Sequence, residues 1–169
     1  MSLRFAILTV SDRSWRGERA DASGPALEEA IRSHGWQVAY RDVLPDELPL
    51  LQEKLISWAD GGEVDVILTT GGTGFSQRDV TPEATQAVIH RAAPGLAEAM
   101  RSYSLKFTPH AMLSRATAGI RGKTLIVNLP GSPKGAMENL GVILPVLQHA
   151  VDLLRGEPGA EAGHTAGAN

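Results

Sequence analysis

The sequence predicts a three-layer α/β protein in which helices cover both faces of a mostly parallel central sheet. Continuous apolar runs alternate along the chain with segments whose apolar residues recur at helical spacing. Such runs are typical of strands buried on both faces of a parallel sheet, and strand–helix alternation predicts right-handed crossovers between them. A length of 169 residues and a hydrophobic content of 43% suit one folded unit. We expect this domain to cover residues 1–155.

The strand and helix signals follow one another in a regular order. Apolar runs predict strands at residues 5–10, 36–43, 64–70 and 124–129. Helical spacing predicts helices at residues 25–34, 48–60, 81–92, 94 to about 107, and 136–154. In the third helix we expect Thr81 to be the N-cap and Pro82 to take the first helical position. Residues 11–13 are interpreted as a polar loop, and residues 112–115 stay unassigned.

Three of the predicted strands end in loops with the composition of a ligand site. Ligands of parallel sheets bind outside the carboxyl ends of the strands. Glycines let the backbone approach a ligand, and successive free N–H groups bind phosphate. Each loop alone is explained equally well as a tight turn, but three at one edge favour a binding site for a phosphorylated, nucleotide-like ligand. The candidate residues of the three loops are Thr9, Ser11 and Asp12; Thr70, Gly71, Gly72, Thr73 and Gly74; and Asn128, Pro130, Gly131, Ser132 and Lys134.

Two familiar nucleotide motifs are incomplete in this chain. The sequence Gly122-Lys123-Thr124 matches the end of a P-loop, but Thr117 stands where the leading glycine is required and the triplet enters a strand. The glycine loop begins like a dinucleotide fingerprint, yet Gln77 replaces the third glycine and the loop follows the third strand. The sequence therefore argues against a P-loop enzyme and against a nicotinamide enzyme.

Two aspartates are candidates for chemistry. Asp79 lies just beyond the glycine loop, where it could bind Mg²⁺ or orient an attacking group. Its alternative role is to stabilise the following helix, but Thr81 and Pro82 already supply a start signal, so we favour a functional role. Asp46 also follows a strand and precedes a helix. From residue chemistry alone, helix capping and function are equally good explanations of Asp46.

The charged and metal-binding residue types limit the function further. Lys134 could bind phosphate oxygens as a cation, although a solvated lysine is about as good an interpretation; Arg78 and Arg115 are weaker candidates of the same kind. The five histidines show no zinc-binding spacing. A net charge of −3 without a basic patch predicts no nucleic-acid partner, and no apolar run approaches the ~20 residues of a membrane span. The absence of cysteine suits a reducing compartment, and we expect a cytoplasmic protein.

Three segments are distinctive when taken together. They are Thr69-Thr70-Gly71-Gly72-Thr73-Gly74, Arg78-Asp79-Val80-Thr81-Pro82-Glu83-Ala84-Thr85 and Asn128-Leu129-Pro130-Gly131-Ser132-Pro133-Lys134-Gly135. These segments resemble the MogA/MoaB family of molybdenum cofactor biosynthesis, which is related to the G domain of gephyrin. The resemblance covers nearly all of residues 4–154. It implies a MogA/MoaB-like fold and an enzyme that uses Mg²⁺ and ATP to adenylylate molybdopterin with release of pyrophosphate.

The resemblance also implies roles for individual residues. Asp46 and Asp79 match the family's two functional aspartates, near the metal and the reacting phosphates. The glycine loop and Ser76 would hold the nucleotide. The rest of the site would be lined by Ser114, Asn128, Pro130, Gly131, Ser132 and Lys134. Family members are trimers or hexamers, so a homotrimer or homohexamer is expected, with a molybdenum insertase as a further possible partner.

Two other functions compete with the adenylyltransferase. Ser132 and Gly135, with residues 109–112 upstream, resemble the MoaB branch more closely than MogA, and some MoaB members are thought to bind molybdopterin without catalysis. A catalytically silent binding or scaffold protein is therefore one alternative. A CinA-like nucleotide hydrolase is another, but the short chain has no extra catalytic domain. Because both aspartates are present, we expect activity.

The last 14 residues, 156–169, contain no apolar residue larger than alanine, and we expect a flexible tail. A chain truncated at Gly156 should keep both its folding and its activity, because the tail adds nothing to a core. Thermal unfolding and turnover of the truncated chain check this expectation. Loss of either property would assign the tail a structural or functional role.

Overall fold

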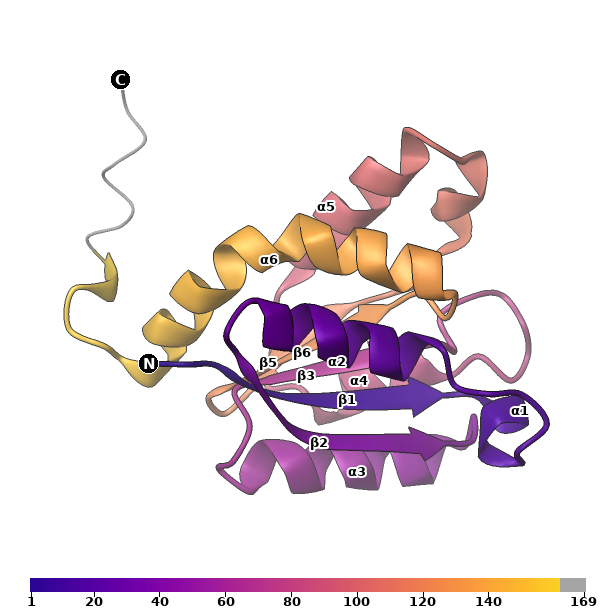
Figure 1. Ribbon diagram of the computed structural model, residues 1–169, viewed down its shortest axis with the longest axis horizontal. Coiled ribbons are helices and arrows are strands. Elements are labelled where there is room, and N and C mark those ends of the chain that lie inside the picture. The colour runs from indigo at the N-terminus through magenta and orange to yellow at the C-terminus, as the bar shows by residue number, and fades with distance from the viewer. Residues whose placement is uncertain (162–169) are drawn as a thin grey trace.

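The computed structural model describes residues 1–161 and confirms the three-layer α/β architecture (Figure 1). The strands are β1 (Arg4–Val10), β2 (Gln37–Leu44), β3 (Val66–Thr70), β4 (Arg91–Ala92), β5 (Ala118–Arg121) and β6 (Thr124–Leu129). The helices are α1 (Asp12–Trp15), α2 (Ser23–Ser33), α3 (Leu48–Asp60), α4 (Thr81–Val88), α5 (Pro94–Leu105), the 3-10 helix η1 (Pro109–Leu113) and α6 (Pro133–Arg155).

The sheet has the order β2-β1-β3-β6-β5-β4. Its first four strands in that order are parallel, whereas β5 is antiparallel to β6 and β4 is antiparallel to β5. Helices α2, α5 and α6 pack on one face of the sheet, and α3 and α4 pack on the other. The central strands are therefore covered on both sides, which explains their continuous apolar sequences.

Alternate residues of each central strand belong to two different cores. In β1, Phe5 and Ile7 pack with Leu27 of α2, whereas Leu8 packs with Leu51 of α3 on the opposite face. All of these side chains are almost fully buried, and burial of a side chain of this size stabilises the fold by roughly 1.5–3 kcal/mol. The two cores fix the register of the strands, and so fix where the strands end.

The antiparallel edge of the sheet is not predicted by the sequence patterns. The helical periodicity continues to residue 92, but α4 ends at Val88 and Arg91–Ala92 form β4. Strand β5 escapes prediction because it contains only four residues, Ala118–Arg121, two of them Ala and Gly. Gly122 and Lys123 form the two-residue turn from β5 to β6, which confirms that the Gly122-Lys123-Thr124 triplet is not a P-loop.

Two local predictions near the site are wrong. Residues 12–15 form the short helix α1 instead of a polar loop, because the Ser11 hydroxyl accepts a hydrogen bond from the Ser14 backbone N–H and caps it. Thr81 is not the N-cap of α4, since Val80 holds that position. The Thr81 hydroxyl instead donates to the Gly71 carbonyl at 2.8 Å, so it ties α4 to the glycine loop.

The C-terminal part of the chain combines a long helix with the predicted tail. Helix α6 ends at Arg155, and Gly156 closes it in the left-handed conformation that favours glycine. Of the predicted tail, residues 162–169 lie outside the described residues, so its flexibility stays a prediction. Among residues 1–161, no helix combines the length and the apolar character that crossing a bilayer requires.

The carboxyl ends of β1, β3 and β6 meet at one edge of the sheet. Thr9 pairs with Thr70, and Thr70 pairs with Leu129, so the three following loops start side by side. Gly71, the first residue after β3, has φ +104°, and a Cβ atom there would overlap the Val10 carbonyl oxygen. The chain therefore needs glycine at position 71 for both its conformation and its space.

At the other end of the strands, where β1 and β3 begin, a buried carboxylate holds the chain together. Asp65, just before β3, accepts hydrogen bonds from the backbone N–H of Arg4 at 2.8 Å and from its guanidinium, and pairs with Arg155 at 2.7 Å. Burial would raise the pKa of Asp65, but the hydrogen bonds from Arg4 and Arg155 outweigh it and lower that pKa below its ordinary value. This cluster joins β1, β3 and the end of α6.

Replacing Asp65 by Asn should destabilise the protein by about 3 kcal/mol, because it leaves Arg155 buried beside a neutral partner. Since the folded pKa is lowered, the carboxylate stabilises the fold above the ordinary aspartate pKa and loses this effect as pH falls through the folded value. Urea unfolding should therefore show that Asp65→Asn lowers the free energy of unfolding at pH 7, and lowers it less in acid. Asp60→Asn, which breaks an exposed pair with Arg121, should cause a much smaller loss. Equal losses for both variants would contradict the role of Asp65.

Replacing Gly71 by Ala should cost about 2 kcal/mol or more, because backbone strain at positive φ is joined by the overlap with the Val10 carbonyl. Gly122→Ala is a matched control, since Gly122 also has positive φ (57°) but has open space around it. The control should lose only about 1–2 kcal/mol of backbone strain. Urea unfolding midpoints measure both. If the two variants lose equal stability, the packing against Val10 contributes nothing.

Candidate functional site

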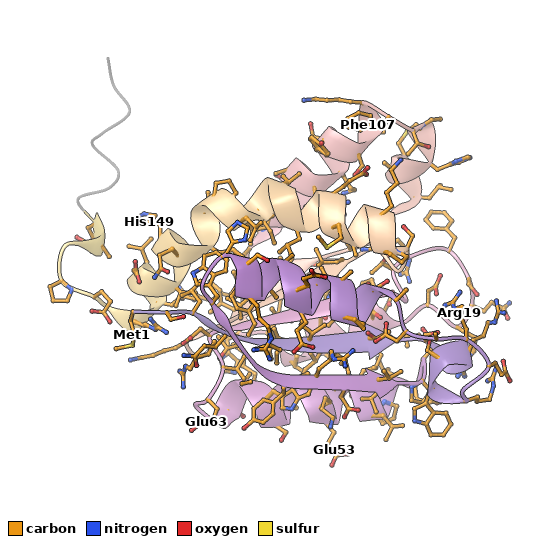
Figure 2. The ribbon with its side chains drawn as sticks, viewed as in Figure 1. Met1, Arg19, Glu53, Glu63, Phe107 and His149 are labelled. Atoms are coloured by element: carbon orange, nitrogen blue, oxygen red, sulfur yellow. The ribbon has the colours of Figure 1, made fainter. Side chains whose placement is uncertain are left out.

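Two adjoining cavities lie at the edge where the parallel strands end. The first, which we call the polar basin, has a volume of about 790 Å³ and lies between the loops after β1, β3 and β6. The second, which we call the apolar cavity, has a volume of about 490 Å³ and lies between α5, η1 and the start of α6. Ser132 lines both. Figure 2 shows Arg19, which lines the polar basin, at this end of the molecule and Glu63 at the other.

The glycine loop forms the wall between β3 and α4. Gly72 has φ +68°, and a Cβ there would collide with the Thr81 hydroxyl. The Gly72 carbonyl accepts a hydrogen bond from the Thr81 backbone N–H at 3.1 Å. Residues 71 and 72 face the polar basin, whereas Thr73 and Gly74 face the apolar cavity. The loop therefore borders both cavities, as a bridge between two parts of one ligand would require.

Asp12 and Asp46 hold the loops after β1 and β2 together. The backbone N–H of Asp12 donates to the Asp46 carboxylate at 3.1 Å, and the backbone N–H of Asp46 donates to the Asp12 carboxylate at 3.0 Å. Arg78 then donates to both oxygens of Asp12 and to Glu47. The hydrogen bond from Arg78 is the main cause that lowers the pKa of Asp12. Arg78 thus links the loop after the glycines to the other side of the basin.

The carboxylate of Asp46 does not cap a helix. Helix α3 has Glu47 at its N-cap and no side-chain capping bond. Instead, Asp46 is half-buried beside Gly72, and its Oδ1 has no hydrogen-bond partner among the described residues. Burial and the charges of Asp12 and Asp79 raise the pKa of Asp46, against the hydrogen bond from Asp12. A buried, unpartnered carboxylate oxygen is costly unless something positive binds it.

Asp79 lies in the same polar basin and does not cap α4 either. Its carboxylate accepts a hydrogen bond from the Ser76 backbone N–H at 3.0 Å, and its own N–H donates to the Ser76 carbonyl at 3.0 Å. Its side chain is next to Gly74, where a Cβ would come within 2.9 Å of the carboxylate. The two predicted aspartates therefore lie in one basin, and each has a carboxylate that the neighbouring helix does not use.

Several predicted site residues use their side chains in hydrogen bonds within the protein. The Thr9 hydroxyl donates to Asp21 and the Thr70 hydroxyl donates to the Pro130 carbonyl at 2.6 Å, although both residues border the basin. Asn128 is completely buried, and its side chain bonds to Thr69, Thr85 and the Thr117 backbone N–H. Asn128 thus joins β6 to β3 and α4, and it lines neither cavity.

The loop after β6 leads directly into α6 at the junction of the two cavities. The Ser132 hydroxyl accepts a hydrogen bond from the Gly135 backbone N–H at 3.1 Å and caps this 23-residue helix. The N-terminal end of a helix favours anions, because its N–H groups are free and its dipole is positive there. Pro130, Ser132 and Lys134 line the apolar cavity, while Gly131 lines the basin. Lys134 is exposed and lies 3.8 Å from Glu138.

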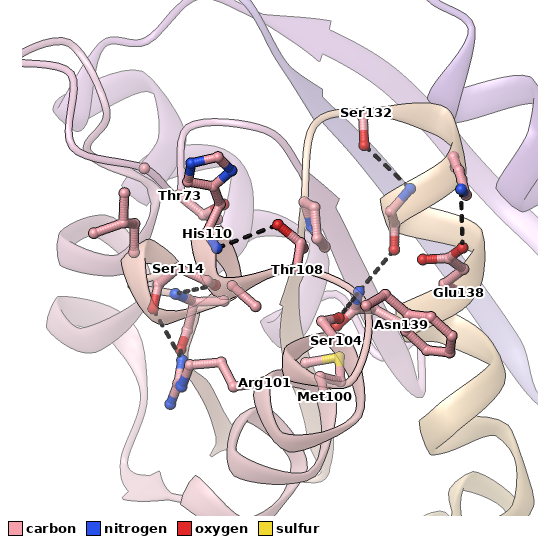
Figure 3. Close-up of a pocket in the computed structure, with 18 of the residues that line it drawn as sticks. Thr73, Met100, Arg101, Ser104, Thr108, His110, Ser114, Ser132, Glu138 and Asn139 are labelled. Atoms are coloured by element: carbon pink, nitrogen blue, oxygen red, sulfur yellow. Dashed lines mark hydrogen bonds and ion pairs between the residues drawn. The ribbon is translucent and has the colours of Figure 1, made fainter.

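The apolar cavity combines hydrophobic walls with polar groups at its rim (Figure 3). Met100 and Phe107 contribute apolar surface. At the α5–α6 junction, Asn139 donates to the Ser104 hydroxyl at 3.2 Å. His110 lies on the opposite rim and comes from η1 (Figure 3). A cavity of this size and character suits a flat organic ring with polar edges.

Arg115 does not face either cavity. Its guanidinium is bonded to the carbonyls of Gly74 and Asp79 and to Glu83, so it contacts protein groups on α4 and the glycine loop. The adjacent Ser114 does line the apolar cavity. The sequence prediction places both in the binding site, and the structure separates them.

Sequence reasoning misses most of the apolar cavity and two of the three arginines of the basin. Arg78, the third, is a weak candidate in the sequence and does line the basin. Arg13 and Arg19 lie in a segment without periodicity, so no pattern marks them. A signal for Met100 and His110 exists only in three dimensions, where α5, η1 and α6 converge. The missed residues that line the two cavities include Arg13, Arg19, Asp21, Ser23, Met100, Arg101, Phe107, His110, Glu138 and Asn139.

The donor set of the basin fits magnesium better than a cation held by protein alone. Among residues 1–161, no group of three or more His, Asp or Glu side chains is placed to hold a metal ion. Magnesium is commonly bound by one or two carboxylates together with substrate phosphates and water. The unpartnered oxygen of Asp46, with Asp79 in the same basin, supplies such a partial set of ligands.

Comparisons with known proteins identify the family and the fold of the chain. A curated molybdopterin adenylyltransferase of Helicobacter pylori is 41% identical over 157 residues, which cover 92% of this chain and 89% of that protein. The structure of the molybdopterin biosynthesis enzyme MoaB of Thermus thermophilus is 52% identical, with a TM-score of 0.87, and covers 92% of this chain and 98% of that one. A MogA structure is 42% identical, with a TM-score of 0.85, over 89% of this chain and 99% of that one.

A more distant structure, the CinA protein of Thermoplasma acidophilum, is 16% identical with a TM-score of 0.66 and covers 86% of this chain and 98% of that one. It shares the fold alone. The model of the family described as probable molybdopterin binding domain matches residues 6–149, which is most of the domain. The chain therefore belongs to this molybdopterin-binding-domain family of molybdenum cofactor biosynthesis proteins.

Proposed function

We propose that the protein is a molybdopterin adenylyltransferase that transfers the adenylyl group of ATP to molybdopterin. The observation that carries the proposal is the half-buried Asp46 carboxylate with an unpartnered oxygen, placed beside the glycine loop between a polar basin and an apolar cavity. A basin that places an unpartnered carboxylate oxygen beside arginines suits a metal–polyphosphate substrate. The relatives with 41–42% identity support the same assignment.

The two cavities divide the substrates between them in this proposal. The polar basin takes the phosphates of ATP, which its three arginines, Arg13, Arg19 and Arg78, and the backbone N–H groups of the glycine loop would bind. The apolar cavity takes the flat pterin ring. The terminal phosphate of molybdopterin then lies near Ser132, at the N-terminal end of α6, where the two cavities join.

The reaction needs little from the side chains beyond positioning. A terminal phosphate oxygen of molybdopterin forms a bond to the α-phosphorus of ATP, the bond from that phosphorus to the bridging oxygen breaks, and pyrophosphate leaves with the electron pair. Because the attacking phosphate is already ionised near pH 7, no strong general base is required. Catalysis can then rest on alignment of the two phosphates and on N–H donors that stabilise the developing charge.

Asp46 and Asp79 are the residues that would hold Mg²⁺. When bound, the ion would neutralise charge on the phosphates as a Lewis acid. Asp12 keeps Asp46 in place through their reciprocal hydrogen bonds, and Ser76 does the same for Asp79. Each carboxylate is therefore oriented by a backbone N–H group before any ligand arrives.

A silent molybdopterin-binding protein is the second candidate. The chain is 52% identical to the MoaB structure and 42% identical to the MogA structure, which favours the MoaB branch, but that MoaB is itself described as an enzyme. The presence of both aspartates in the basin is the reason we place the enzyme first. The CinA-like hydrolase has the support of a common fold only.

We further infer a homotrimer or homohexamer from the family resemblance, and a cytoplasmic location from the absence of cysteine. A molybdenum insertase is the partner that would receive the adenylylated pterin. Analytical ultracentrifugation of the purified chain distinguishes the trimer from the hexamer.

The function is tested by measuring pyrophosphate release from ATP with Mg²⁺, with molybdopterin added or withheld. The native chain should release pyrophosphate only when the pterin is present. Asp79→Asn should lower the rate about 100-fold or more, because a misplaced or uncharged group at the phosphates loses the alignment. Asp60→Asn, at an exposed carboxylate outside both cavities, should leave the rate unchanged.

Each other outcome selects a different function. Molybdopterin binding without pyrophosphate release selects the silent binder. Hydrolysis of a nucleotide in the absence of the pterin selects the hydrolase. An Asp79→Asn rate equal to that of the native chain would remove Asp79 from the chemistry.

A further inference from the structure

One arginine connects the glycine loop, Asp79 and helix α4. Arg115 lies between η1 and β5, in a segment without regular structure. Its backbone N–H donates to the Thr73 carbonyl at 2.8 Å. Its Nε donates to the Gly74 carbonyl at 2.7 Å, and its Nη2 donates to the Asp79 carbonyl at 2.7 Å. The guanidinium thus reaches both ends of the loop formed by residues 75–78.

That loop has few other restraints. All four of its residues are exposed. Within it, Ser76 and Asp79 exchange two hydrogen bonds, and Arg78 reaches across to Asp12 and Glu47. Arg78 connects the middle of the loop to Asp12 and Glu47 across the basin. Arg115 supplies the connection at the two ends of the loop, because it holds the carbonyls on both sides.

Arg115 is itself fixed from two directions. Glu83, in the first turn of α4, pairs with its guanidinium, and this hydrogen bond is the main cause that lowers the pKa of Glu83. Arg101 of α5 donates to the Ala116 carbonyl at 2.6 Å and so holds the backbone next to Arg115. A planar guanidinium can bond to several acceptors in a fixed geometry, which an ammonium group cannot do.

We propose that Arg115 is a positioning residue for the adenylyl transfer, because it holds the Gly74 and Asp79 carbonyls and thereby places the Asp79 carboxylate against the substrate phosphates. This inference rests on the proposed function for its catalytic part. Arg115 itself does not contact the ligand. The sequence alone suggests that the charge of Arg115 binds phosphate; we assign Arg115 the positioning role instead.

Two substitutions at Arg115 and one matched control test the proposal. Arg115→Ala removes the connection, and Arg115→Lys keeps the charge but not the fork of donors. Arg121→Ala is the control, because Arg121 also pairs with a carboxylate, Asp60, and donates to the carbonyl of Val88 at the other end of α4. The control thus also removes a carboxylate pair, here with α3, and a bond to a carbonyl, here of α4, away from both cavities.

Turnover separates positioning from direct binding. Both Arg115 variants should lose about 10–100-fold in kcat, with KM for ATP changed less than about threefold, because a shift of about 1 Å in a catalytic group can cost about 100-fold in rate. Arg121→Ala should keep the native kcat. A rise in KM at native kcat would make Arg115 a ligand-binding residue and overturn the proposal, as would equal kcat values for Arg115→Ala and Arg121→Ala.

Hydrogen exchange provides a readout that does not need activity. Amide exchange in residues 74–80 should become faster in Arg115→Ala and stay native in Arg121→Ala. If the native chain shows no turnover, the proposed function fails, and this exchange experiment still decides whether Arg115 orders the loop. Unchanged exchange in Arg115→Ala would overturn the proposal in either case.

Glu83 offers an internal check. Because Glu83 acts through Arg115, Glu83→Gln should lower kcat less than Arg115→Ala, and the double variant should match Arg115→Ala alone. Additive losses would show that the two residues act independently, which contradicts the arrangement. Thermal unfolding of every variant establishes that each is folded at the assay temperature.

Discussion

The close packing of three parallel strand ends around Gly71 is the constraint on which the site depends. The Gly71 N–H continues the sheet by donating to the Leu129 carbonyl, while its Cα lies against the Val10 carbonyl and against Gly131. Its own carbonyl accepts the Thr81 hydroxyl. Four segments of the chain therefore meet at a residue without a side chain. The backbone groups that would bind phosphate take their positions from this packing.

Negatively charged side chains lie close together in the basin and repel one another. Asp46 lies close enough to Asp12 and Asp79 for both charges to raise its pKa, after the larger effect of burial, and one of its oxygens has no partner among the described residues. Arg78 offsets part of this charge through Asp12 but lies on the exposed side. Groups held in an unfavourable environment are more often functional than structural, because a fold gains nothing from such a conflict.

The sequence predicts what parallel topology brings together. Buried strands and glycine-rich ends can be recognised locally, and the rule that ligands bind at carboxyl ends then places the glycine loop and Asp79 at the site. A functional role for Asp46 followed only from the family resemblance. The apolar cavity could not be predicted, because its walls come from three helical segments whose packing is not encoded by spacing. The roles of Asn128 and Arg115 were also hidden. A polar residue looks the same in sequence whether it faces a ligand or bonds to its neighbours, as Asn128 does in β6 and Arg115 does in the segment before β5.

Around the glycine loop, some residues hold the backbone in place and others face the substrate phosphates. This arrangement explains why the chain needs neither cysteine nor histidine for the proposed chemistry. Rigid elements hold what must not move: β3 and β6 are buried on both faces, and Asn128 joins them to α4. Residues 75–78 are exposed, and Arg115 holds the Asp79 carbonyl at one end of this loop, so the position of Asp79 depends partly on a remote side chain. Phosphoryl chemistry is accelerated chiefly by alignment and charge, and loss of alignment is more damaging than loss of any acid or base. In a protein of this kind, the residues that hold the loop should therefore be important for activity, as well as the residues that contact the phosphates.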